Sequence, residues 1–227
     1  IGASVYQILT SDLDEGQNGI VEYSLSDLST FTVGKNDGVI RLNRKLDREL
    51  ESFIEFVAVA LDKGSPSLTS SMTFTVSIDD ANDNSPEVSP TSYSATIDED
   101  VPIGSQLLEI SATDADVGMN ADLRFTITSG DPNRDFLLNS HTGELSIQKR
   151  LDYERKKVYN LVVLVEDQGN PSLSDRADVT ITVQDVNDCI PVFVDSPYVA
   201  YVQENVQQLP VHVMQVSARD DDTGAYG

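Results

Sequence analysis

Apolar and polar residues alternate along most of the chain, and this pattern predicts β-strands. Met72, Phe74, Val76 and Ile78 alternate with polar neighbours, which is the period of a half-buried strand. Similar alternation occurs in the ranges 21–25, 40–42, 54–60, 93–97, 108–110, 125–127, 145–147, 159–165 and 179–183. No stretch shows the apolar stripe of an amphipathic helix. We therefore predict an all-β protein, since about seven short strands in roughly 100 residues are typical of a β-sandwich.

The first eleven residues are expected to form the second strand of a domain, with Val5 and Leu9 offering an apolar edge. The turn signal Asn36-Asp37-Gly38 follows further along the chain. Residues 54–60 then predict a strand that delivers Asp62 at its end. The chain would thus place acidic residues where strands end.

The strand at 72–78 runs into a polar cluster, Asp-Ala-Asn-Asp-Asn at 80–84, which is followed by Ser85-Pro86. Carboxylates, carboxamides and backbone carbonyls are the ligands that calcium takes. A single copy is equally compatible with a structural turn, because Asx residues are common in turns. However, the cluster returns as Asp-Val-Asn-Asp-Cys at 185–189, which is 105 residues later (185 − 80).

The other acidic residues recur at nearly the same spacing. Asp47 and Glu49 return at 152 and 154, Asp62 returns at 167, and Glu99 returns at 204. The Asp-x-Asp pair at 12 and 14 returns at 114 and 116 and again at 220 and 222. Repeats of this length are whole domains in tandem and not solenoid units. We therefore divide the chain into residues 1–84 (a repeat lacking its first strand), 85–189 (a complete repeat) and 190–227 (the beginning of a third).

Charge narrows the classes of function. The net charge is −23 over 227 residues, which argues against nucleic acid or an anionic membrane surface as a partner. Two like charges about 4 Å apart repel by roughly 4 kcal/mol at an effective dielectric near 20. Acidic loops gathered at the ends of neighbouring sandwiches would therefore separate unless divalent cations bridge them. Cys189 is the only cysteine, so an internal disulfide is excluded.

Taken together, the Asp-x-Asn-Asp linkers, the Leu-Asp-Arg-Glu at 46–49 and the Asp-x-Asp-x-Gly-x-Asn-Gly at 12–19 resemble extracellular cadherin repeats over essentially the whole chain. The form of these motifs resembles that of the internal repeats of long cadherins of the Fat, Dachsous or protocadherin kind. The resemblance implies tandem seven-stranded Greek-key sandwiches of cadherin-like, immunoglobulin-like architecture joined by calcium-binding linkers. It also implies about three Ca²⁺ ions per complete linker.

The family's calcium roles carry over by motif to two linkers in this sequence. For the first linker, the resemblance implies the ligands Asp47, Glu49, Asp80, Ala81, Asn82, Asp83, Asn84, Asp114, Asp116, Asn120 and Asp167. For the second linker, it implies Glu99, Asp152, Glu154, Asp185, Val186, Asn187, Asp188, Cys189, Asp220 and Asp222. Asp12, Asp14 and Asp62 would belong to a further linker whose upstream half is absent. Cys189 stands where the motif has Asn and is expected to offer only its backbone carbonyl.

The resemblance implies calcium-dependent cell–cell adhesion on the extracellular side of the plasma membrane. The parent chain would be a single-pass membrane protein anchored outside this fragment, and its partner another cadherin ectodomain, bound homophilically or heterophilically. A secreted calcium-dependent matrix or structural protein is the nearer alternative. A hydrolase with a carboxylate pair is more remote, because the acids lie at strand ends in two equivalent copies. We expect no enzyme and no catalytic residues.

Overall fold

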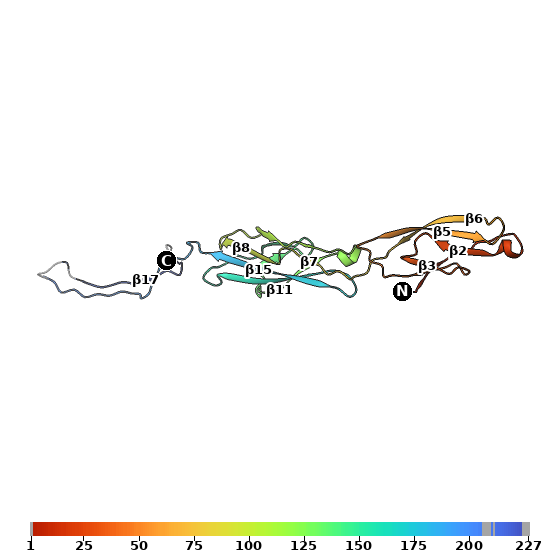
Figure 1. Cartoon of the computed structure of the whole chain (residues 1–227). Coiled ribbons are helices and arrows are strands. Elements are labelled where there is room, and N and C mark those ends of the chain that lie inside the picture. Colours follow the sequence, from red (N-terminus) through yellow and green to blue (C-terminus); the bar gives the residue numbers. More distant parts are fainter. Residues whose placement is uncertain (1, 206–209, 211, 224–227) are drawn as a thin grey trace. The chain divides into compact units, whose positions relative to one another are not determined.

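The computed structural model describes residues 2–205, 210 and 212–223. The chain divides into two compact units, Ile1–Ala81 and Asn82–Gly227, and each is described by itself below. Both units consist of β-strands, with one short 3₁₀ helix in each described part (Figure 1). This confirms the all-β class that the alternating pattern predicts.

Unit 1 contains two three-stranded sheets, β2-β5-β6 and β1-β4-β3. The elements are β1 (Ser4–Gln7), η1 (Gly16–Gly19), β2 (Val21–Leu25), β3 (Phe31–Val33), β4 (Val39–Leu42), β5 (Phe53–Asp62) and β6 (Thr69–Ser77). The core between the sheets consists of Leu25, Phe31, Ile40, Ile54, Phe56 and Ala58. The rings of Phe31 and Phe56 lie 4.8 Å apart, and Phe74 stacks on Phe56 at 5.5 Å.

The apolar edge predicted at the start of the chain is wrong in its residues. Leu9 is 81% exposed and Val5 is also exposed, whereas Ile8 packs against the core. The pairing of β1 with β4 shifts register between Ser4 and Tyr6. A bulge of this kind breaks the strict alternation of faces, so simple parity counted from Val5 selects the wrong residues.

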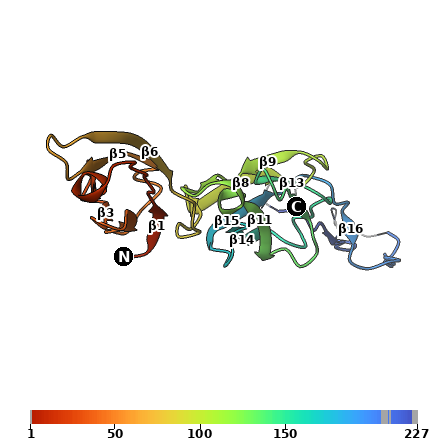
Figure 2. The ribbon, with the colours of Figure 1, turned by 90° about the vertical axis from the view of Figure 1, so that its right-hand side faces the viewer.

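Unit 2 contains one four-stranded sheet, β11-β14-β15-β8, and a three-stranded sheet, β12-β13-β9, with the strand pairs β10-β7 and β16-β17. Figure 2 shows β9 and β13 apart from β14 and β15. The elements are β7 (Glu87–Val88), β8 (Ser92–Asp98), β9 (Gln106–Glu109), β10 (Ala112–Thr113), η2 (Gly118–Ala121), β11 (Arg124–Ser129), β12 (Phe136–Leu138), β13 (Glu144–Ile147), β14 (Val158–Glu166), β15 (Ser174–Gln184), β16 (Val192–Phe193) and β17 (Ala218–Arg219).

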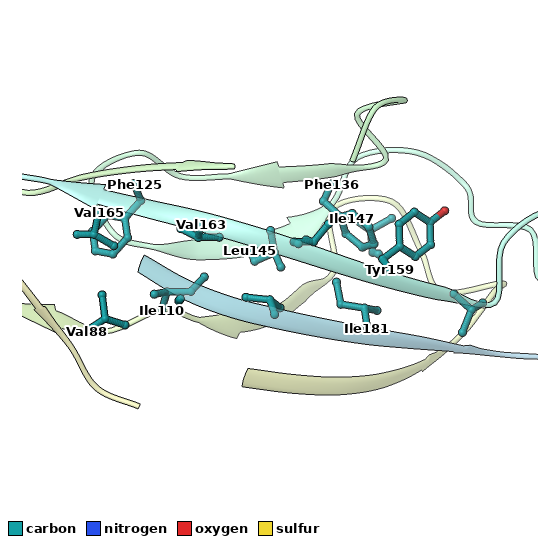
Figure 3. Close-up of a cluster of buried hydrophobic side chains, with 14 of the residues drawn as sticks. Val88, Ile110, Phe125, Phe136, Leu145, Ile147, Tyr159, Val163, Val165 and Ile181 are labelled. Atoms are coloured by element: carbon teal, nitrogen blue, oxygen red, sulfur yellow. The ribbon is translucent and has the colours of Figure 1, made fainter. Parts of the chain in front are cut away.

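The core of unit 2 lies between its two larger sheets (Figure 3). Strand β15 contributes every second residue to it: Ala177, Val179, Ile181 and Val183 are each at most 2% exposed. Tyr159 from β14 is fully buried and meets the ring of Phe136 edge-on at 4.8 Å. Burial of large apolar side chains is the main favourable term in folding, so this core accounts for most of the cohesion of the repeat.

One tight turn occurs at the same place in both units. Gly38 has φ +64° and Gly143, 105 residues later (143 − 38), has φ +74°. A Cβ at these positions would lie 2.4 Å from the carbonyl oxygen of Ile8 and 2.2 Å from that of Ile110, respectively. Glycine is therefore required both by the left-handed backbone and by the close approach of the neighbouring chain.

Candidate metal centre

The Asp-x-Asp motifs form the same local turn in all three copies. The backbone N–H of the second aspartate donates to a side-chain oxygen of the first. The distances are 2.9 Å for Asp14 to Asp12, 2.9 Å for Asp116 to Asp114, and 3.2 Å for Asp222 to Asp220. An Asx turn of this kind fixes the first carboxylate against its own backbone. The same turn recurs in each copy and fixes the backbone at the second aspartate.

The late aspartates, Asp62 at the end of β5 and Asp167 directly after β14, are buried in equivalent surroundings. Asp62 accepts hydrogen bonds from the backbone N–H groups of Leu68 (3.0 Å) and Gly64 (2.9 Å). These bonds lower the pKa of Asp62 below its ordinary value, because they stabilise the charged form. Within unit 1, Asp12, Asp14 and Asp62 line one cavity.

In unit 2 the amides of the first linker motif are already bound to carboxylates. The Asn82 side-chain amide donates to both oxygens of Asp167, at 3.3 and 3.2 Å, and to the carbonyl of Pro171 at 2.6 Å. The Asn84 side chain donates to Asp116 at 2.7 Å. The structure thus brings four of the residues predicted as ligands of the first linker into two contacting pairs.

The acidic residues of the first linker that belong to unit 1 carry their own counter-charge. The guanidinium of Arg48 donates to Asp80 at 2.5 Å and also pairs with Glu49. Asp47 accepts a hydrogen bond from the backbone N–H of Leu50 at 3.1 Å. An arginine can neutralise two carboxylates at once because its guanidinium is a planar fork of donors. The motifs did not indicate this role of Arg48, which is the middle residue of Asp-Arg-Glu at 47–49.

The second linker lies entirely within unit 2 and gathers several carboxylates. Glu99 is 4% exposed and accepts hydrogen bonds from the backbone N–H groups of Tyr153 (2.7 Å) and Val186 (2.9 Å). Glu99, Glu154 and Asp185 each offer one oxygen, and these three oxygens lie within 4.8 Å of one another. Oxygens this close from three carboxylates repel strongly without a cation.

A second group shares Glu154 with the first. Glu154, Asp188, Cys189 and Asp222 each offer one ligand atom, and all four atoms lie within 4.8 Å of one another. Asp222 is 6% exposed, and its Oδ1 accepts from the backbone N–H of Cys189 at 3.2 Å. Asp222 Oδ2 and Asp185 Oδ1 are buried without a hydrogen-bond partner. Buried oxygens of this kind are costly unless something else binds them.

The electrostatics of the second linker follow from this crowding. Desolvation, together with the charges of Glu99, Asp185 and Asp222, raises the pKa of Glu154 above its ordinary value. The hydrogen bond to Asp222, burial and the nearby carboxylates raise the pKa of the Cys189 thiol to about 12. Both shifts have the same cause, since an added negative charge is unfavourable among existing ones.

Several other predicted residues do not belong to these two groups. Asp152 is exposed and accepts from the backbone N–H of Arg155 at 2.7 Å. Ala81, Asp83 and Asn187 are exposed, and Asn120 lies in η2. Thr223, which sequence reasoning did not select, donates its backbone N–H to Asp185 at 2.7 Å. The side chain of Cys189 also enters the acidic group, although only its carbonyl was expected to contribute.

Repeated β-sandwich units with acidic residues collected at the strand ends define a class of tandem all-β modules with acidic linkers. The family model for the cadherin domain matches residues 1–79 and 93–184. The chain therefore belongs to the cadherin family, as the motifs indicate.

Individual members of the family are similar to nearly the whole chain. Human Protocadherin Fat 4 is 38% identical over 99% of the chain, and mouse Cadherin-23 is 35% identical over 100% of it. The chain spans 5% and 7% of the length of these relatives, respectively. A crystal structure of mouse Cadherin-23 EC22-24 has a TM-score of 0.83 and 31% identity, covering 99% of this chain and 73% of the other.

A structure of PcdhgB3 EC1-4 has a TM-score of 0.85 and 27% identity, covering 98% of this chain and 55% of the other. These neighbours confirm the predicted cadherin-type sandwich.

In the part of the chain that the structure describes, no helix has the length and apolar character needed to cross a bilayer.

Proposed function

We propose that this chain is a segment of a cell-surface cadherin ectodomain, stiffened by calcium at its linkers, which takes part in calcium-dependent cell–cell adhesion. The observation that carries the proposal is the pair of carboxylate groups in the second linker, with buried oxygens of Asp185 and Asp222 that lack a hydrogen-bond partner. The family membership supports the same reading over a hydrolase, because the matched domain is a cadherin domain.

The donor set of the second linker fits Ca²⁺. Calcium takes six to eight oxygen ligands and tolerates irregular geometry. The carboxylates of Glu99, Glu154, Asp185, Asp188 and Asp222 could supply such oxygens from two groups that share Glu154. An ion there would bind Asp222 Oδ2 and Asp185 Oδ1, the two atoms that are otherwise costly to bury. The bound cation would also remove the mutual repulsion that raises the pKa of Glu154.

We extend the proposal to about three Ca²⁺ ions in each complete linker, on the recurrence of the motifs. At the second linker, Asp152, Val186, Asn187, Cys189 and Asp220 would complete the sites. At the first, the ligands would be Asp47, Glu49, Asp80, Ala81, Asn82, Asp83, Asn84, Asp114, Asp116, Asn120 and Asp167. Asp12, Asp14 and Asp62 would serve a further linker. The same proposal assigns the repeats to residues 1–84, 85–189 and 190–227, the last of which includes residues outside the described part.

The partner would be another cadherin ectodomain, bound homophilically or heterophilically, on the extracellular side of the plasma membrane. A relative with TM-score 0.78 is a protocadherin gammaB7 EC3-6 structure described as a cis-dimer, which supports contact between cadherin chains. The net charge of −23 also supports a partner other than nucleic acid. The parent chain would be membrane-anchored outside this segment.

Calorimetric titration of the metal-free chain with Ca²⁺ tests the proposal. We expect saturable binding of several ions with dissociation constants of about 10⁻⁴ to 10⁻³ M, the range of extracellular modules. Asp222→Asn should remove at least one binding event, because it removes the charge of a buried ligand. Asp178→Asn is the matched control, since Asp178 is an exposed residue on β15. Equal titrations for both variants and the unaltered chain would contradict the proposal.

A further inference from the structure

The two linker motifs differ at their last residue, and the difference brings sulfur into the second linker. The first motif ends in Asn84, and the second ends in Cys189. The sulfur of Cys189 lies 3.7 Å from Asp188 Oδ1. It also lies within 4.8 Å of a carboxylate oxygen from each of Glu154 and Asp222. Cys189 is a free, half-buried thiol, so its sulfur is available as a ligand atom.

These four donors match the preference of a different class of cation from calcium. Calcium is a hard ion that takes oxygen, whereas a thiolate is a soft ligand that selects ions such as zinc. Zinc is bound by Cys and carboxylate ligands, almost always four of them in a tetrahedron. At metal–ligand distances of about 2.0–2.3 Å, such ligands lie about 3.5 Å from one another. The four atoms in the structure lie within 4.8 Å of one another, which exceeds that spacing by at most about 1.3 Å.

A second observation points to a ligand at this place. Asp222 is 6% exposed, and its carboxylate belongs to the same four-residue group. Its Oδ1 is fixed by the backbone N–H of Cys189, while its Oδ2 is buried with no hydrogen-bond partner. A buried carboxylate oxygen without a donor is unfavourable, and a cation between Asp222 and the sulfur of Cys189 would provide what it lacks.

We propose that Glu154, Asp188, Cys189 and Asp222 form a binding site for a thiophilic divalent cation of the zinc class. Because three of these residues are carboxylates that the proposed function assigns to calcium, the two cations compete for the second linker. On binding, the thiol releases its proton to the buffer and the thiolate sulfur coordinates the metal. The site does not depend on adhesion. It makes the second linker sensitive to thiophilic metals, whereas the first linker has Asn84 at the equivalent position and lacks a thiol.

Cadmium alone, titrated into the full chain in calcium-free buffer under reducing conditions, tests the site through the ultraviolet charge-transfer band of a cadmium–thiolate bond. We expect a band that saturates at one equivalent in the unaltered chain and is absent in Cys189→Ser. Asp222→Asn should weaken the binding at least tenfold, because it removes the charge of one of the four proposed ligands. Zinc should displace cadmium and abolish the band. Asp178→Asn should change nothing.

Two results would overturn the proposal. The first is the absence of a saturable band in the unaltered chain, and the second is a band whose affinity is unchanged in Asp222→Asn, which indicates a lone thiol. Circular dichroism of each variant establishes that it is folded. A separate arm with added Ca²⁺ should weaken cadmium binding. If cadmium binds as expected but calcium does not compete, the zinc-class site stands and the calcium assignment of the proposed function at this linker fails.

Discussion

Strands β6 of unit 1 and β15 of unit 2 have the same alternating pattern but differ in burial. Phe74 on β6 is half-buried, whereas Val179, at the same place 105 residues later (179 − 74) and opposite Tyr93 of β8, is 1% exposed. Strand β15 pairs with β14 on one side and runs parallel to β8 on the other. Among the described residues, β6 pairs only with β5.

This difference shows that alternation determines which face of a strand is apolar, while the neighbouring strand determines how completely that face is buried. Strand β8 covers the outer edge of β15 over Asp178–Gln184. In the described part of unit 1, no strand occupies the same edge of β6. Among the residues that the structure describes, fifteen form the buried cluster of unit 2 and six that of unit 1, so we expect unit 2 to be the more stable unit.

The largest expected effect comes from truncating this core. Ile181→Ala should reduce the free energy of unfolding of unit 2 by about 2–5 kcal/mol, since Ile181 is fully buried. The equivalent change in unit 1, Val76→Ala, should cost roughly 1 kcal/mol because Val76 is half-buried. Hydrogen exchange measured for the strand amides of each unit distinguishes the two. Equal losses in both units would contradict the role assigned to β8.

The next prediction concerns the middle residue of Asp-x-Glu, which is Arg48 in unit 1 and Tyr153 in unit 2. Arg48 and Asp80 form a mostly buried pair with side chains 16% and 14% exposed. Arg48→Tyr should therefore destabilise the calcium-free protein by about 1–3 kcal/mol, because Glu49 and Asp80 lose their counter-charge. Thermal unfolding in chelator and in calcium measures the effect, which should shrink when calcium is present.

The reverse change, Tyr153→Arg, tests the same difference between the two units at the middle residue of Asp-x-Glu. The hydroxyl of Tyr153 lies 3.5 Å from that of Thr223, beside Asp185. An arginine there should act as an internal counter-ion and weaken calcium binding at the second linker. An unchanged calcium titration would show that the middle residue has no influence.

A smaller effect is expected at a buried polar position that holds different residues in the two units. In unit 2, Asp135 is 2% exposed and accepts a hydrogen bond from Tyr159 at 3.0 Å. In unit 1, Thr30 and Ile54 stand at these positions, and Thr30 accepts from Arg44 at 3.0 Å. Tyr159→Phe should cost unit 2 about 1–2 kcal/mol. Adding Asp135→Thr should recover part of the loss in chemical denaturation, and a double variant no better than the single one would refute this.

The smallest predicted effect is a pH dependence in unit 1. The backbone N–H groups of Leu68 and Gly64 lower the pKa of Asp62 below its ordinary value of 3.8. The carboxylate therefore stabilises the folded state above that value, and the stabilisation is lost as pH falls through the lowered pKa. In chelator, the stability of unit 1 should decline below about pH 4, less steeply in Asp62→Asn. Parallel pH profiles would rule out the role of Asp62.

The strands were predictable from the sequence because alternation is a local pattern. Features that depend on contacts between distant parts of the chain were not predictable in this way. Alternation located the strands that carry Phe74 and Val179, and the repeated acidic motifs located Glu99, Asp185 and Asp222. The pattern did not single out strands β3 and β12, with three residues each, and β12 is an unbroken apolar run, Phe136-Leu137-Leu138, that shows no alternation. The partial exposure of Phe74 arises because, in the described part of unit 1, no strand pairs with the outer edge of β6.

The motif also did not predict the surroundings of the Cys189 sulfur, because these depend on how the chain brings the carboxylates of Glu154 and Asp222 close to the sulfur. Likewise, Thr223 binds Asp185 across 38 residues of sequence, which no local pattern reveals. Whether the predicted ligands bind calcium together stays a prediction.

The central claim is that calcium locks consecutive repeats into a fixed arrangement by neutralising their acidic linkers. Small-angle X-ray scattering of the full chain, recorded in millimolar Ca²⁺ and again in chelator, tests it most directly. We predict a single extended particle with calcium and a broader distribution of maximum dimensions without it, while circular dichroism shows the strands intact in both. Superimposable scattering curves under the two conditions would contradict the claim.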